Sequence, residues 1–173
     1  NKAEGIILVT NVPEGVVVLD EIAKQELTKL PIISHWGIAS GQFASALANP
    51  IGMYNISVLQ TFHFSHQKNS QSKQLLEAYY NKYGLVDSQA IGGVTGLAHA
   101  YDLIHLIAAA ADKAGSIEID KLRSALESLQ NVSGAVKHYD APFTKERHDA
   151  LWSKDYFMTK YNDKGHLVTI GQK

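Results

Sequence analysis

Cysteine is absent from all 173 residues of this sequence. Disulfide bridges are therefore excluded, and so are the cysteine-rich sets of ligands that hold structural zinc. An oxidising compartment, in which a stray thiol is a liability, is compatible with this composition.

A charge imbalance and a long apolar run are also lacking. The 16 basic and 17 acidic residues give a formal net charge of -1, and no basic stripe stands out. Nucleic acid is therefore not expected as a partner. The longest apolar run, residues 103–111, is interrupted by His105 and is too short to span a bilayer, so we expect a buried helix there. With 45% hydrophobic residues, the chain has the composition of a globular domain with a core.

Catalytic motifs are missing as well. The sequence has no G-x-S-x-G elbow, no P-loop and no H-E-x-x-H helix. Residues 92–96 (GGVTG) loosely resemble a phosphate-binding loop, but no strand clearly precedes them, and glycine for close packing at a helix start explains them better. His148 and Asp149 are adjacent and suggest acid–base chemistry, yet we interpret this pair as structural. We therefore expect a protein that is not an enzyme.

Histidines at metal-ligand spacing do not form a complete set. His63 and His66 make an H-x-x-H pair, but no clustered carboxylate supplies the third and fourth donors that zinc needs. His99 and His105 do not complete a set on one helix face. We expect no metal site and no cofactor.

The N-terminus lacks an initiator methionine and a signal peptide. Within a few residues the chain enters a buried-strand pattern at residues 5–9. Because native chains rarely begin on a core strand, we expect this sequence to be a fragment of a longer protein.

The first third of the sequence predicts a strand, a helix and a second strand. Residues 6–9 form a continuous apolar run, typical of a parallel strand that is covered on both faces. Pro13 lies in a turn where a helix can start, and the helical spacing continues to about Leu27. A second apolar strand follows at residues 31–33. This order predicts an α/β fold in which βαβ units form a parallel sheet with right-handed crossovers.

The remaining elements are predicted by apolar spacing and by turn residues. A stripe of apolar residues at i, i+3 and i+4 spacing marks a long helix, which Leu103, Leu106 and Ile107 widen until it should be buried on most sides. The other predicted elements are a short helix at 43–48, a β-rich stretch at 53–64, helices at about 70–84 and 119–129, and a hairpin of strands at 156–161 and 166–170.

With these elements in place, the chain resembles the C-terminal half of the type I periplasmic solute-binding proteins, the branched-chain amino-acid-binding and extracellular ligand-binding receptor family. Val12-Pro13-Glu14-Gly15 looks like the turn that follows a strand of the family's second lobe. Tyr101-Asp102, the alanine-rich stretch after it and Gly115-Ser116 look like the family's long helix. The closing strand, Asp-Lys-Gly turn and strand look like the family's C-terminal hairpin. The order of these motifs carries the resemblance, since none is diagnostic alone.

The resemblance implies two α/β lobes joined by three crossovers, with the ligand in the cleft between them. Residues 1–64 and 155–173 would belong to the second lobe, and residues 65–154 would return to the first. Most of the first lobe would then be absent, so the helix at 92–113 would lose its packing partner. Because a large apolar face rarely stays exposed, we expect the fragment to self-associate.

The implied function is non-catalytic binding of a small organic solute, such as an amino acid or a related carboxylate. The implied partner is a membrane ABC permease, and the implied location is the bacterial periplasm, reached by means of a signal peptide that this fragment lacks. One alternative is the ligand-binding sensor region of a receptor or regulator. Another is a flavodoxin-like enzyme, which would need a nucleophile or cofactor loop at a strand end; Asn11 and Trp36 do not supply one.

Ligands of open α/β sheets bind beyond the carboxyl ends of the strands. We therefore predict that Asn11, Ser34, His35 and Trp36 line the ligand site. In the amino-acid-binding relatives, the position of Asn11 is usually aromatic, and an acidic residue at the position of Trp36 holds the ligand's ammonium group. Tryptophan instead stacks on rings or contacts cations, so an aromatic or other apolar ligand is an alternative to a branched-chain amino acid.

Each of these residues also has a purely structural interpretation. Asn11 can serve as a turn residue, His35 as a hydrogen-bonded histidine within a turn, and Trp36 as a cover for the strand end. Gln60 and His63, near the expected hinge, are weaker candidates for the site.

Overall fold

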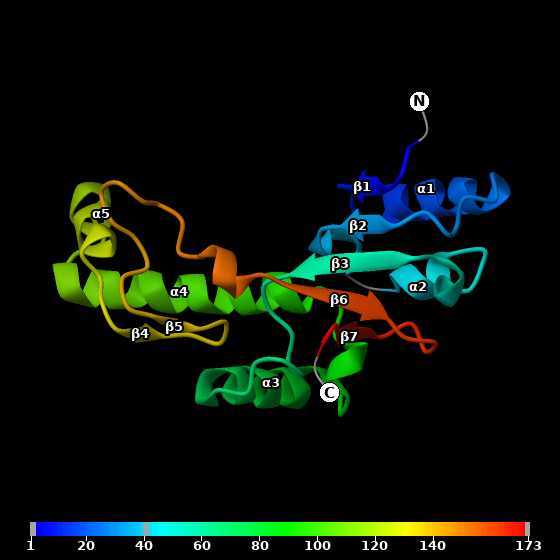
Figure 1. Cartoon of the computed structure of the whole chain (residues 1–173). Coiled ribbons are helices and arrows are strands. Elements are labelled where there is room, and N and C mark those ends of the chain that lie inside the picture. The colour runs from blue at the N-terminus through cyan, green and yellow to red at the C-terminus, as the bar shows by residue number, and fades with distance from the viewer. Residues whose placement is uncertain (1–2, 40–41, 172–173) are drawn as a thin grey trace. The chain divides into compact units, whose positions relative to one another are not determined.

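The computed structural model describes residues 3–39 and 42–171. The chain divides into two compact units (Figure 1). The first unit contains Asn1–Thr61, Asp87–Val94 and Tyr156–Lys173, and the second contains Phe62–Val86 and Thr95–Asp155.

The first unit is built on a five-stranded sheet with the order β1-β2-β3-β6-β7. Its strands are β1 (Ile6–Leu8), β2 (Ile32–Ser34), β3 (Ile56–Gln60), β6 (Phe157–Tyr161) and β7 (Leu167–Thr169). The first three strands are parallel, and β6 and β7 join them in antiparallel orientation. The predicted α/β fold with parallel βαβ units is therefore confirmed.

Helix α1 (Val12–Lys24) connects β1 to β2, and the short helices η1 (Trp36–Ile38), α2 (Phe43–Ala46) and η2 (Ile51–Met53) lie between β2 and β3. A further short helix, η3 (Ser88–Ala90), also belongs to this unit. Pro13 occupies the first turn of α1, where its missing N–H costs no hydrogen bond.

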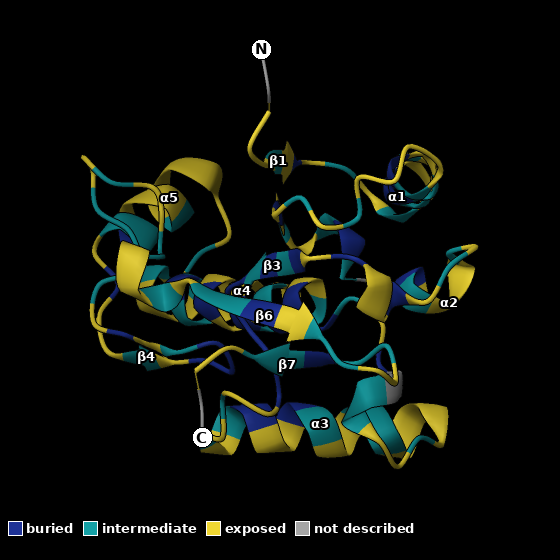
Figure 2. Cartoon of the chain, turned by 45° about the vertical axis from the view of Figure 1, so that its right-hand side comes forward, coloured by how far each residue is buried: buried dark blue, intermediate teal, exposed yellow. Residues whose placement is uncertain are grey.

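The core of the first unit lies on one face of the sheet. Leu19 and Ile22 of α1 pack with the inward residues of the strands, and burial alternates along β3 as expected for a sheet with two unlike faces (Figure 2). On the other face, Ile7 is 84% exposed and Ile33 is 51% exposed. The expectation that the first strand is covered on both faces is therefore wrong for the described residues, since no element among them packs over Ile7.

The second unit contains α3 (Ser70–Tyr83), α4 (Val94–Ala114, in this unit from Thr95 on), α5 (Ile119–Glu127) and η4 (Ser153–Asp155). A two-stranded hairpin of β4 (Val132–Ser133) and β5 (His138–Tyr139) accompanies them. Local interactions define both ends of α3. The side chain of Asn69 accepts a hydrogen bond from the backbone N–H of Ser72 at 2.8 Å, and Gly84 ends α3 with a φ of 66°.

Asp102, in the middle of α4, joins this helix to the hairpin. Its carboxylate accepts hydrogen bonds from the backbone N–H groups of Ala135 at 2.5 Å and Val136 at 2.9 Å, and from the hydroxyl of Tyr139 at 2.8 Å. A Cβ atom at Gly134 would lie 2.3 Å from the same carboxylate, so glycine is required there. The second unit is therefore organised around one buried carboxylate.

The long helix is less buried than its spacing predicts. Leu103, Ile104 and Ile107 are exposed, so the expectation of a helix buried on most sides is wrong within the described chain. By length and composition, α4 is also apolar enough to cross a membrane, with a mean hydropathy of 1.3, although the sequence shows no uninterrupted run of that length. A single helix of this kind does not by itself indicate a membrane span. The opposite side of α4 packs on the hairpin through Asp102.

Candidate functional site

The loops that follow β1 and β2 leave the sheet at the same edge. Leu8 and Ser34, the last residues of these parallel strands, are register partners. The Ser34 hydroxyl is buried and donates to the backbone oxygen of Leu8 at 2.8 Å. Of the four residues predicted to line the site, Ser34 thus uses its side chain to join β2 to β1.

Gly37 brings these two loops into contact. A Cβ atom at this position would lie 2.3 Å from the backbone oxygen of Thr10. Since any other residue would displace that backbone, glycine sets the spacing between the segment after β1 and the segment after β2. The sequence shows a glycine in a turn but gives no sign of this long-range contact.

His35 has a defined hydrogen-bonding role. Its Nδ1 atom accepts a hydrogen bond from the backbone N–H of Gly37 at 2.9 Å, at the N-cap of η1. Because Nδ1 acts as the acceptor, the neutral ring carries its proton on Nε2. The half-buried imidazole therefore keeps one N–H donor, at Nε2, that the loop backbone does not use.

Trp36 lies against this imidazole. The two rings are stacked, with centroids 5.6 Å apart and planes 19° from parallel. Trp36 as a residue is 40% exposed, so part of it stays accessible to a ligand.

Asn11 occupies the N-cap position of α1, with an extended backbone (φ -88°, ψ -179°). Its side chain makes no capping hydrogen bond and is exposed, so the amide is not consumed by the helix. The Oγ1 atom of the preceding Thr10 is buried without a hydrogen-bond partner among the described residues, which adds a polar group at this edge that the sequence did not single out.

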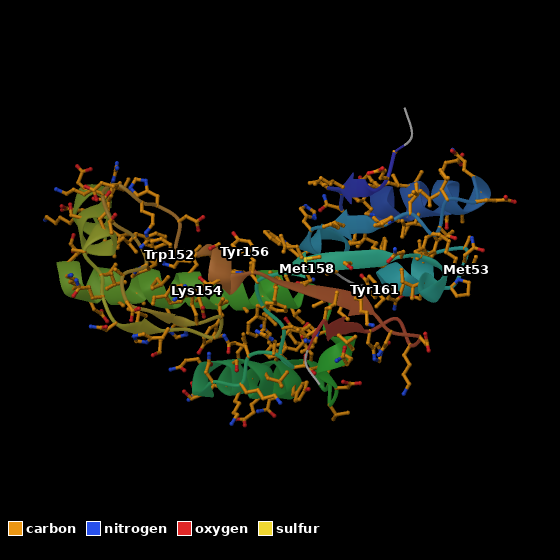
Figure 3. All side chains as sticks on the ribbon, viewed as in Figure 1. Met53, Trp152, Lys154, Tyr156, Met158 and Tyr161 are labelled. Carbon is orange, nitrogen blue, oxygen red and sulfur yellow. The ribbon has the colours of Figure 1, made fainter. Side chains whose placement is uncertain are left out.

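Tyr161, on the antiparallel strand β6, holds the loop that follows β2. Its hydroxyl donates to the backbone oxygen of Ile38 at 2.9 Å, and its ring lies 5.9 Å from that of Phe43 (Figure 3 labels Tyr161 on β6). Burial raises the pKa of this phenol, which stays protonated and holds the end of η1.

The two weaker candidates are both buried. Gln60 lies at the end of β3, paired in register with Phe157. His63 belongs to the second unit, and its Nδ1 atom is 2.6 Å from the hydroxyl oxygen of Ser65. Burial lowers the pKa of His63, and the nearby His66 acts in the same direction. Neither side chain is displayed to solvent.

Among the described residues, one hollow lies beside the ends of α4 and α5 and another beside the segment after β5, and neither is lined by a predicted site residue. One of about 460 Å³ is lined by the ends of α4 and α5, including Lys113 and Lys121. The other, of about 180 Å³, lies beside Lys137, Arg147 and Trp152. There the Arg147 guanidinium lies 4.6 Å from the centre of the Trp152 ring and donates to the backbone oxygens of Ala141, Pro142 and Asp149, so its donors are largely used within its own loop.

Among the residues that the structure describes, no group of three or more histidine or carboxylate side chains is close enough to hold a metal ion. At the edge after β1 and β2, Asn11 and His35 offer hydrogen bonds and Trp36 offers an aromatic surface for stacking. This arrangement can bind a polar, partly flat molecule.

Comparisons with known proteins identify the fold. No protein-family model and no curated protein matches the chain. Among solved structures, a type 1 periplasmic binding protein from Bordetella pertussis matches with a TM-score of 0.80 and 17% identity, over 97% of this chain and 46% of its own.

Two further structures agree with this match. LivJ from Streptococcus pneumoniae, a branched-chain amino acid transporter substrate-binding protein solved with isoleucine, has a TM-score of 0.72 and 19% identity, over 98% of this chain and 45% of its own. A fatty acid ABC transporter substrate-binding protein from Thermomonospora curvata has a TM-score of 0.61 and 20% identity, over 96% of this chain and 42% of its own. The chain therefore has the fold of the type I periplasmic binding proteins and spans just under half the length of the solved members that it matches.

Proposed function

We propose that this chain is part of a protein that binds a small organic solute without catalysis, at the carboxyl edge of β1 and β2. The observation that supports this most is the group formed by Asn11, His35 and Trp36 at the edge where α/β sheets bind their ligands. An exposed amide, an imidazole N–H and an indole face provide directed hydrogen bonds and apolar contact, the usual composition of a solute site.

In this proposal, residues 1–64 and 155–173 belong to the second lobe of a two-lobed protein, and residues 65–154 return to the first. Hinge closure of the other lobe over the edge removes the ligand from water and strengthens the hydrogen bonds. No bond of the solute is made or broken, so the protein has no enzymatic activity.

We further propose that the protein works in the bacterial periplasm, reached by means of a signal peptide, and delivers its solute to a membrane ABC permease. The support is the similarity of fold to substrate-binding proteins of ABC transporters. One of these is named for branched-chain amino acids and the other for fatty acids, so proteins of this fold are named for solutes with and without an ammonium group.

A thermal-shift screen of the intact protein tests the proposed function. The library contains amino acids, aromatic acids and other small carboxylates, and titration calorimetry follows each hit. A ligand at a hundredfold excess over its dissociation constant stabilises the folded state by ~2.7 kcal/mol, a shift that is easily measured. We expect Trp36→Ala to abolish the shift.

Met53→Ala is the matched control. Met53 is 42% exposed and Trp36 is 40% exposed, but Met53 precedes β3 at the amino edge of the sheet (Figure 3). This variant should keep full affinity. If no member of a broad library shifts the melting temperature, solute delivery is contradicted, and the alternative of a sensor region with a protein partner gains support. If binding survives Trp36→Ala, the site lies elsewhere.

A further inference from the structure

We propose that the ligand of the Asn11–His35–Trp36 site is a carboxylate with a flat or branched apolar body and without an ammonium group. This assignment rests on the proposed function and names the substrate class of the same site. It follows from the one polar group that the His35 ring leaves for a ligand, from the lack of acidic residues in the segments after the parallel strands, and from the apolar surface of Trp36.

His35 presents a donor and no acceptor. The backbone N–H of Gly37 occupies Nδ1 at 2.9 Å, which leaves Nε2–H as the ring's remaining polar group. A ligand atom that meets this group must accept a hydrogen bond, as a carboxylate oxygen does. An ammonium group has only donors, so it makes no hydrogen bond with Nε2–H.

Acidic residues are missing from the edge. The segments that follow the parallel strands, residues 9–11, 35–37 and 61–63, contain no aspartate or glutamate. The first acidic residue to follow any of these segments in the sequence is Glu14, which is exposed in the first turn of α1, where it complements the helix dipole. An ammonium group that leaves water without a counter-charge loses much free energy, and the neutral amide oxygen of Asn11 supplies no such charge, so these segments favour a ligand without an amine.

Trp36 provides the apolar surface. Its ring stacks on His35 at a centroid distance of 5.6 Å and is 40% exposed. An indole face attracts cations, but only weakly when the cation stays partly in water. Because the imidazole that carries the donor stacks beside this ring, an apolar body on Trp36 and a carboxylate on Nε2–H satisfy both groups at once.

Matched pairs of ligands test this assignment by titration calorimetry on the intact protein. Each pair shares a carbon skeleton and differs only in the α-ammonium group: L-phenylalanine against 3-phenylpropanoate, and L-leucine against 4-methylpentanoate. The same comparison is made for every acid that the screen identifies. We expect each carboxylate to bind at least tenfold more tightly than its amino acid.

The outcomes separate the two proposals. If an amino acid binds as tightly as its partner without the amine, or if the hits are neutral or cationic, the assignment is overturned while solute binding stands. If no compound in the library binds, the proposed function itself is contradicted and the assignment is lost with it.

Variants of the two rings locate the effect. His35→Gln keeps an N–H donor near the position of Nε2 and should retain affinity within threefold, whereas His35→Phe should weaken carboxylate binding at least tenfold. Trp36→Glu places a counter-charge at the edge and should reverse the preference toward amino acids. Thermal melts without ligand check that each variant is folded. A folded His35→Phe protein with full affinity overturns the assignment, and so does a folded Trp36→Glu protein that still prefers the carboxylate.

Discussion

Neighbouring residues at the carboxyl edge of the sheet have different roles, although the sequence alone does not distinguish them. Ser34 and His35 are neighbours in a polar turn, yet the Ser34 hydroxyl is directed into the sheet and the His35 ring stacks against an exposed indole. The sequence could show that polar residues follow a strand. Which of them point inward was decided by contacts with Leu8, Thr10 and Gly37.

Buried histidines give the protein a testable pH dependence. Burial lowers the pKa of His63 below its ordinary value of 6.5, so the folded state binds this proton less tightly than the unfolded chain does. The contribution of neutral His63 to the free energy of unfolding is therefore fully present above about pH 6.5. It is lost as the pH falls through the folded-state pKa, by about 1.4 kcal/mol for each unit by which the folded-state pKa lies below the unfolded-state pKa.

We expect His63→Asn, which keeps an acceptor near the Ser65 hydroxyl, to reduce the loss of stability between pH 7.5 and pH 5 in urea unfolding experiments. His99 has a pKa that burial also lowers, so some dependence remains. The exposed His105→Asn serves as the control. An unchanged slope in the His63 variant would show that this residue is not responsible.

At the scale of elements, local signals predicted most boundaries. The proline lies in the first turn of α1 as the sequence predicts, and α3 (Ser70–Tyr83) matches the predicted helix at about 70–84. The hairpin β4–β5 was missed because two-residue strands carry no periodicity. Asp102 holds this hairpin from a helix more than thirty residues away in sequence, as the separations of 33 and 34 residues to Ala135 and Val136 show.

Asp102→Asn should destabilise the second unit. The carboxylate accepts from two backbone N–H groups and one hydroxyl, and an amide would turn an N–H group toward one of these donors. We expect a loss of ~1–3 kcal/mol, the cost of leaving a buried donor without an acceptor. Chemical denaturation followed by circular dichroism measures it.

Asp112→Asn, on the exposed side of the same helix, makes the same chemical change without these contacts and should alter the stability little. Equal effects of the two variants would mean that the Asp102 hydrogen bonds contribute nothing beyond solvation.

At the scale of the whole molecule, two apolar surfaces have no covering element among the described residues. One is the sheet face that carries Ile7 and Ile33, and the other is the side of α4 that carries Leu103, Ile104 and Ile107. The solved proteins of the same fold are more than twice as long as this chain, as the matched shares of 42% to 46% indicate.

We predict that the 173-residue chain self-associates through the exposed side of α4, because apolar surfaces of this kind seldom stay in water. Analytical ultracentrifugation over a range of concentrations should show oligomers, and Ile104→Glu should shift them toward monomer. Ile117→Glu is the control, since Ile117 is 83% exposed in the segment between α4 and α5, against 67% for Ile104. A chain that stays monomeric at high concentration would contradict the prediction.

The sequence by itself determined the α/β class, the βαβ order, the helix ends and the absence of catalytic motifs. These properties depend on apolar spacing and on residues such as Pro13 and Gly84, which act within a few positions of themselves. Tertiary structure decided which apolar faces stay exposed and that the Ser34 hydroxyl bonds to the neighbouring strand. Those outcomes depend on contacts between segments far apart in the chain, such as Ser34 with Leu8, Gly37 with Thr10 and Asp102 with the hairpin, for which local periodicity holds no information.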